Sequence, residues 1–230
     1  LREARASHAL LPPALLRNRD VSIGAVLNLI VGTVMMSTLV VGPFFLAGGL
    51  HLAPAAIGAT MAAGPLASIC TGVIAGRVVD RFGTRLMTTA GLSAMVVGAL
   101  ALALLPSWWG LIGYITGTVL LAPGYQLFLA ANNTGVLSAT PTEHRGVTSG
   151  LLGLSRNLGL VTGASVLAAL FAAASGAAEI ATASPEALTA ALKVTFLVTA
   201  ALLAGAALLS LAASRQTSRA RGTATPTTAR

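Results

Sequence analysis

The chain has 230 residues and a formal net charge of +8; 55% of its residues are hydrophobic and only 9% are charged. A soluble globular domain carries about 25% charged residues, because its core must be covered by polar surface. The composition therefore excludes an ordinary soluble protein and indicates a membrane protein.

Six long apolar runs follow one another along the chain. About 20 apolar residues in a helix cross a hydrocarbon core about 30 Å thick. Backbone groups in lipid must be bonded within the segment, so the runs are predicted to be helices. No Asp or Glu lies inside a run, and only Arg156 and Lys193 place a charge there. The predicted spans are Val21–Ala47, Leu52–Ala75, Leu86–Leu105, Trp109–Ala131, Val147–Ala174 and Leu188–Ala213.

The spans divide the chain into three expected parts. Residues 1–20 form a cytoplasmic lead-in, 21–213 a six-helix transmembrane bundle, and 214–230 a disordered basic tail of Thr, Ala and Arg. The chain starts at Leu1 and its first residues look like the end of a longer connection. We therefore expect the C-terminal piece of a larger protein.

The basic residues predict the orientation. Twelve of the 14 Lys and Arg residues fall in the segments on one side of the spans, and none falls in the three opposite connections. Such residues concentrate in cytoplasmic segments, so both termini are predicted to be cytoplasmic, in a cell inner membrane. Contact with anionic lipid accounts for the net charge, and nothing here predicts a nucleic-acid partner. Trp108 and Trp109 are expected at the outer interface.

Prolines and glycines in the spans predict bends and close packing. Pro43, Pro65 and Pro123 each remove a backbone hydrogen bond and can bend a helix. Glycines four residues apart favour close approach of neighbouring helices, either as general packing or as a dimer face. These pairs are Gly72/Gly76, Gly113/Gly117, Gly146/Gly150 and Gly159/Gly163.

Polar residues cluster in the fourth and fifth spans. Gln126, Asn132 and Asn133 either line a polar transport path with Arg156 and Asn157 or pair between helices. Arg156 lies about 16 Å along a helix from Arg145. A cation at that depth is a candidate functional residue, although it can also snorkel toward the headgroups.

Lys193 lies close to the outer end of the sixth span, where snorkelling is favoured.

The residue inventory predicts neither a catalytic centre nor a metal or cofactor site. Cys70 is the single cysteine, and His8, His51 and His144 are far apart in sequence. Asp80 and His51 fall on opposite sides of the membrane, so they cannot form a hydrolytic triad. We therefore expect a protein that is not an enzyme.

A charged turn joins the second and third spans. Its pattern Gly-x-x-x-Asp-Arg-x-Gly-x-Arg resembles the loop signature of the major facilitator superfamily, which lies between the second and third helices of each six-helix half. Thr84 replaces a basic residue usual in that family. The pattern is formed by Gly76, Asp80, Arg81, Gly83 and Arg85.

A second run, from Arg145 to Gly163, is similar to the fifth helix of the C-terminal half in the 14-helix drug:proton antiporter branch. Together the two resemblances imply an all-α half-transporter of two inverted three-helix repeats, missing its N-terminal half. Such a protein exports small drug-like molecules in exchange for protons by alternating access. The proton-carrying acid is then expected in the missing half. The charged turn, with Asp80, is expected to act as a conformational latch.

Two other classes remain open at this point. A six-helix permease subunit driven by a separate ATPase has the same number of spans, although the short inner loops leave little room for a coupling helix. A non-transporting membrane scaffold or truncated remnant is the other alternative.

Overall fold

The computed structural model describes residues 17–176 and 183–222, with side chains as far as residue 216, and every element in these ranges is helical. Six helical segments are long and apolar enough to cross a membrane, which confirms the predicted all-α architecture. The elements are α2 (Arg19–Phe44), the π-helical η2 (Phe45–Gly49), α3 (Pro54–Met61), α4 (Ala63–Phe82), α5 (Thr84–Leu104), α6 (Pro106–Ser138), the 3-10 helix η3 (Thr142–His144), α7 (Arg145–Ser175) and α8 (Pro185–Gly222).

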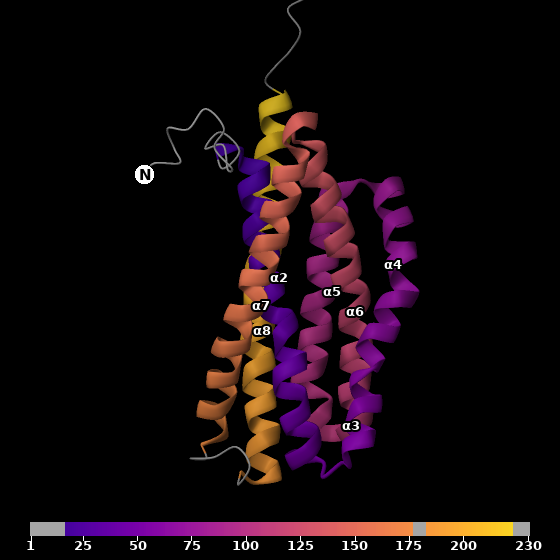
Figure 1. Cartoon of the computed structure of the whole chain (residues 1–230), viewed down its shortest axis with the longest axis vertical. Coiled ribbons are helices and arrows are strands. Elements are labelled where there is room, and N and C mark those ends of the chain that lie inside the picture. Colours follow the sequence, from indigo (N-terminus) through magenta and orange to yellow (C-terminus); the bar gives the residue numbers. More distant parts are fainter. Residues whose placement is uncertain (1–16, 177–182, 223–230) are drawn as a thin grey trace, which may run out of the picture.

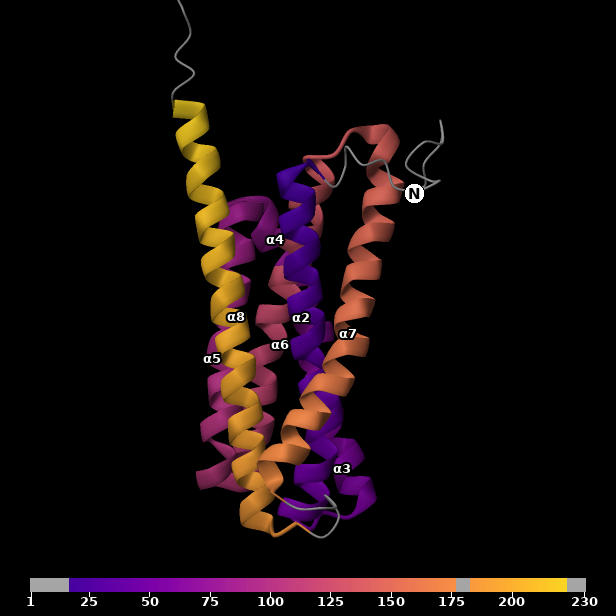
Figure 2. The same cartoon turned by 90° about the vertical axis from the view of Figure 1, so that its left-hand side faces the viewer.

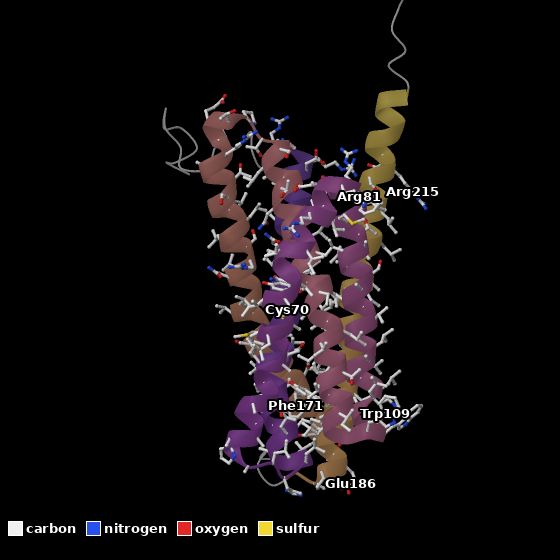
Figure 3. The ribbon with its side chains drawn as sticks, turned by 90° about the vertical axis from the view of Figure 1, so that its right-hand side faces the viewer. Cys70, Arg81, Trp109, Phe171, Glu186 and Arg215 are labelled. Carbon is white, nitrogen blue, oxygen red and sulfur yellow. The ribbon has the colours of Figure 1, made fainter. Side chains whose placement is uncertain are left out.

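The long helices stand side by side along one axis (Figures 1 and 2). One end of the bundle holds the start of α2, the α4–α5 turn, the α6–α7 connection and the end of α8, and we call it the basic end. Arg81 and Arg215 lie toward this end, whereas Trp109 and Glu186 lie toward the other (Figure 3). The segments that the charge pattern assigned to one side of the membrane therefore lie together.

The packing follows two inverted repeats. The first comprises α2, α3–α4 and α5, and the second comprises α6, α7 and α8. α2 starts at the basic end and α6 at the opposite end (Figure 1). The middle helix of each repeat packs mainly on the first helix of the other repeat, because α4 lies against α6 and α7 lies against α2.

Prolines explain two of the three irregularities in the spans. The second span breaks at Ala62 into α3 and α4, since Pro65 has no N–H to bond the carbonyl of Met61. Soon after Pro43, α2 continues into the π-helical η2. Pro123 lies inside helical α6, whose irregular residue is instead Gly110 with φ of +51°.

The last helix begins and ends outside its predicted span. The Ser184 side chain accepts a hydrogen bond from the Ala187 backbone N–H at 3.2 Å and so caps its start. The segment after Ala213, expected to be a disordered tail, is helical as far as Gly222, in keeping with the helix propensity of Ala and Arg. Residues 1–16 and 223–230, which hold most of the lead-in and the end of the tail, lie outside the described residues.

Apolar side chains fill the interior and also cover the exterior. Phe45, Phe128 and Phe196 are fully buried in one central core. Large apolar side chains are also widely exposed, with Ile69 on α4 at 73% and Val161 on α7 at 68%. Exposed apolar surface on this scale suits lipid rather than water. The fold is that of a multi-pass membrane protein.

Candidate functional site

A polar cavity of about 180 Å³ lies between α2, α6 and α7, and we call it the Arg156 cavity. Its polar lining consists of Asn28, Asn133, Ser149 and Arg156. Arg156 lies about 16 Å along α7 from that helix's first residue, so the cavity reaches a depth at which a membrane offers no water to a polar group.

The backbones of α2 and α7 touch beside this cavity, in a contact that we call the α2–α7 seam. A Cβ atom at Gly32 would collide with the carbonyl oxygen of Arg156, and one at Gly159 would collide with that of Leu29. Only glycine permits so close an approach. Because the Arg156 carbonyl lies directly against α2, the seam fixes the position of the Arg156 backbone relative to α2.

Three asparagines link the helices around the cavity. Asn132 on α6 donates to the Gly24 carbonyl and to Asn28 Oδ1, both at 3.1 Å. Asn28 on α2 donates to the Leu152 carbonyl on α7 at 3.2 Å and to Asn133 Oδ1 at 3.4 Å. Asn28 is only 2% exposed and Asn132 only 5%. The network therefore satisfies buried amides and joins three helices.

Arg156 has no such partner in the part of the chain that the structure describes. In the described residues no hydrogen bond or ion pair reaches its guanidinium group, and its Nε atom is buried without an acceptor. An arginine at the centre of a membrane helix costs about 2.5–3.5 kcal/mol on insertion scales. Because the side chain lines the Arg156 cavity, its position favours a functional role over snorkelling along the lipid surface.

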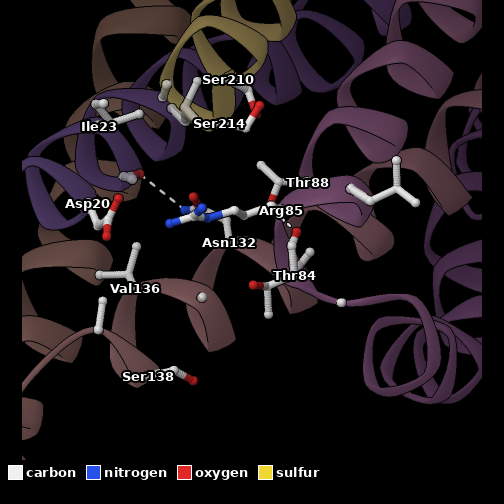
Figure 4. Close-up of a pocket in the computed structure, with 18 of the residues that line it drawn as sticks. Asp20, Ile23, Thr84, Arg85, Thr88, Asn132, Val136, Ser138, Ser210 and Ser214 are labelled. Carbon is white, nitrogen blue, oxygen red and sulfur yellow. Dashed lines mark hydrogen bonds between the residues drawn. The ribbon is translucent and has the colours of Figure 1, made fainter. Parts of the chain in front are cut away.

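A larger cavity, of about 630 Å³, lies at the basic end where α2, α5, α6 and α8 converge. Arg85 extends from the start of α5 across this space toward Asp20 on α2 (Figure 4). Asn132 lines this cavity, whereas the next residue, Asn133, lines the Arg156 cavity. The hydrogen bond between Asn132 and Asn28 thus lies where the two polar spaces approach each other.

The charged turn is a one-residue connection. α4 ends at Phe82 and α5 begins at Thr84, with Gly83 between them at φ of +85° and ψ of 153°. This backbone region is essentially restricted to glycine, which explains the second glycine of the signature. A Cβ atom at Gly76 would meet open space, so no described segment makes a close approach there.

The charges of Asp80 and Arg81 face outward, whereas the Arg85 side chain of the same turn lines the larger cavity. Asp80 is exposed, and within the described residues no ion pair joins it to a cation. The Arg81 guanidinium lies 5.3 Å from the centre of the Phe82 ring, a weak cation–π contact at an exposed site. The predicted latch role of Asp80 therefore depends on a partner beyond the described residues.

The structure separates the polar residues that sequence placed together. Asn132 and Asn133 lie at the cavities with Arg156, whereas Gln126 points to α4 and donates to the Ser68 carbonyl at 3.0 Å. Asn157 is exposed. Asn28 was missed, although an asparagine in a charge-free first span was a signal that could have revealed it.

The remaining candidates lie apart from this region. Lys193 is exposed on α8, as expected for a snorkelling side chain. Cys70 is exposed on α4. Among the described residues no group of three or more His, Cys, Asp or Glu side chains is placed to hold a metal ion.

The sequence profile described as Major Facilitator Superfamily matches residues 22–229 of the chain. The chain belongs to the major facilitator superfamily. This membership confirms the resemblance carried by the charged turn, and it points to a transporter rather than to an enzyme.

Two curated relatives of this superfamily member are named as transporters. Uncharacterized transporter YebQ of Escherichia coli (strain K12) is 31% identical over 159 residues, which are 69% of this chain and 35% of YebQ. Riboflavin transporter RibZ of Clostridioides difficile (strain 630) is 27% identical over 172 residues, or 75% of this chain and 38% of RibZ. The chain thus matches little more than a third of each relative.

Proposed function

We propose that this chain forms the C-terminal six-helix half of a secondary active transporter that exports small drug-like molecules. The observation that carries the proposal is the Arg156 cavity, where an arginine without a partner among the described residues lines a polar space inside a membrane bundle. The inverted repeats and membership of the superfamily support the same conclusion. In such transporters the substrate binds near the midplane between two halves that rock against each other.

Proton exchange is the coupling that we propose. Proton relays in membranes use ionisable side chains within the bundle. The described acids are Asp20, Asp80, Glu143 and Glu186, and all lie near the ends of helical segments. We therefore assign the proton-carrying acid to the missing N-terminal half.

We further propose that the basic end faces the cytoplasm of the cell inner membrane, with both chain termini on that side. The excess of arginine at that end supports this orientation. A fluorescent protein that folds only in the cytoplasm, fused after Arg230, should fluoresce. A fusion protein that inserts into the membrane but does not fluoresce would indicate the opposite orientation.

The transport proposal can be tested in inside-out membrane vesicles that contain the full-length protein encoded by this gene. A panel of cationic, neutral and anionic fluorescent lipophilic compounds is added after a proton gradient has been set up. We expect at least one compound to accumulate and to dissipate part of the gradient, as reported by a pH-sensitive dye. Vesicles without the protein serve as the control.

The outcomes separate transport from coupling. Accumulation that leaves the proton gradient unchanged would contradict proton exchange but not transport. Absence of accumulation for every compound, with the protein inserted and monodisperse, would contradict the proposed function as a whole.

A further inference from the structure

The Arg156 cavity has more hydrogen-bond donors than acceptors. The Arg156 guanidinium carries several N–H donors and cannot accept a bond. Asn133 and the exposed residue Ser149 also line the space. The Asn133 amide N–H₂ and the Ser149 hydroxyl can donate, although the hydroxyl can also accept, and no described residue accepts a bond from either side chain. Three donor groups from α6 and α7 thus lie around one cavity.

The amide oxygens beside these donors each already accept one hydrogen bond. The amide oxygen of Asn133 accepts a bond from Asn28, and the amide oxygen of Asn28 accepts a bond from Asn132. The Leu152 carbonyl likewise accepts a bond from Asn28. Because the asparagine network uses its oxygens internally, the cavity presents mainly N–H and O–H groups.

No carboxylate of the described chain balances the charge of Arg156. No Asp or Glu lines the cavity, and the four described acids lie near the ends of helical segments. A planar guanidinium binds a carboxylate with paired hydrogen bonds, and such a pair gains strength where water is excluded.

We infer that the Arg156 cavity binds a carboxylate group, which Arg156, Asn133 and Ser149 hold together. Where the carboxylate belongs to a transported compound, the inference rests on the proposed transport function. If this chain is one half of a longer transporter, as proposed, the same chemistry can also come from an acidic side chain of the other half.

The size and walls of the cavity define the compound further. Its volume of about 180 Å³ exceeds several-fold the roughly 30 Å³ that one water molecule occupies in the liquid. It is smaller than the roughly 300–1,000 Å³ of a pocket for a whole drug-sized molecule. Gly153 and three leucines, Leu129, Leu137 and Leu152, complete the lining. The cavity thus suits the carboxylate end of an amphiphilic organic acid, with a short apolar segment beside it.

The experiment compares 2-naphthoate with its amide, 2-naphthamide, on the purified full-length protein. The two probes share an apolar body and differ in charge, and binding is measured by calorimetry in detergent. We expect the wild type to bind the carboxylate at least tenfold more tightly than the amide.

Three variants and a control locate this preference. Arg156→Gln removes the cation, and Asn133→Asp places a competing carboxylate in the same cavity with little change in volume, so both should abolish the preference. Arg156→Lys keeps the charge and should retain part of it. Lys193→Gln removes the other cation of the spans, which is exposed on α8, and should leave the preference intact.

A second measurement identifies a carboxylate supplied by the protein. Each acid within the spans outside this chain is replaced by its amide, alone and together with Arg156→Gln, and the unfolding midpoint is recorded without a probe. A pair whose effects are strongly non-additive identifies the protein as the source.

The two measurements decide the inference. A probe preference lost in Arg156→Gln and Asn133→Asp, or an acid coupled to Arg156, supports it. If no acid is coupled to Arg156, either of two results overturns the inference. One is equal binding of both probes to the wild type, and the other is a preference for the carboxylate that survives in both Arg156→Gln and Asn133→Asp. Continued transport of neutral compounds in vesicles would then show that the transport function stands without carboxylate recognition.

Discussion

The two inverted repeats hold their middle helices in different ways. In the most apolar stretch of the span Thr142–Ser175, which contains α7, 28% of the residues are buried, compared with 6% in that of the span Pro54–Phe82, which contains α3 and α4. α7 meets α2 through backbone contacts at Gly32 and Gly159. The described polar contact between α4 and α6 is a single side-chain bond, from Gln126 to the Ser68 carbonyl.

This difference shows how equivalent positions in two repeats can serve separate purposes. The α2–α7 seam brings Arg156 and the asparagine network into fixed relation, which a binding cavity requires. α4 has few buried residues, so most of its surface is available to lipid or to another part of the proposed transporter. Substitutions in the two contacts should therefore differ strongly in effect.

The largest effect is expected at the α2–α7 seam. Gly159→Leu would push side-chain atoms into the α2 backbone at Leu29, and we expect a loss of about 3 kcal/mol in stability, at the upper end for overpacked cores. The unfolding midpoint and the monodisperse fraction in size-exclusion chromatography measure it. Gly205→Ala on α8, where a Cβ meets open space, is the control. Equal behaviour of the two variants would mean that the seam is not a tight contact.

The next largest effect is expected in the asparagine network. Asn28→Ala removes the partner of Asn132 and of the Leu152 carbonyl, and unsatisfied buried groups cost about 1–3 kcal/mol. Thermal unfolding in detergent should show this loss, whereas Asn157→Ala, at an exposed position of α7, should leave the midpoint unchanged. An unchanged midpoint for Asn28→Ala would indicate that water replaces the network.

A smaller effect is expected between α4 and α6. Gln126→Leu removes the bond to the Ser68 carbonyl, and side-chain bonds between membrane helices average about 0.6 kcal/mol. The unfolding midpoint should fall slightly, and Gln216→Leu at an exposed site on α8 should not lower it. A loss as large as that of Asn28→Ala would remove the contrast between the two contacts.

The smallest effect on stability is expected at Asp80, which is exposed and has no ion pair within the described residues. We predict that Asp80→Asn inserts and unfolds like the wild type but transports several-fold more slowly, because the proposed latch shifts the balance between conformers. Vesicle transport rates test this prediction, with Glu143→Gln as the control at another exposed acid. Rates equal to the wild type would contradict the latch.

The sequence predicted where the helices lie along the chain better than it predicted which helices pack against one another. Charge-free runs located all six spans to within a few residues for most ends, because the hydrocarbon core imposes length and composition on any helix that crosses it. The signature in the turn anticipated Gly83, since few residues other than glycine adopt its backbone angles. Both properties depend on local sequence alone.

The composition of the site could be predicted only in part. Arg156, Asn132 and Asn133 were singled out from the sequence, and in the structure they line the two cavities. Gln126 was grouped with them but faces α4. Which side of α6 meets α2, and which meets α4, depends on how three helices are rotated and packed. The role of Asn28 could not be predicted for the same reason, because its partners lie more than 100 residues away in the chain.

The single-residue connection at Gly83 has a mechanical consequence for α4. Because α5 begins directly after Gly83, the connection is too short to extend, and α4 cannot move along its axis unless α5 moves with it. The break at Ala62 interrupts the helix at its other end. A change in the angle between α4 and α5 would therefore have to occur at Gly83, and a spin label on Cys70, which is exposed on α4, would report such a change.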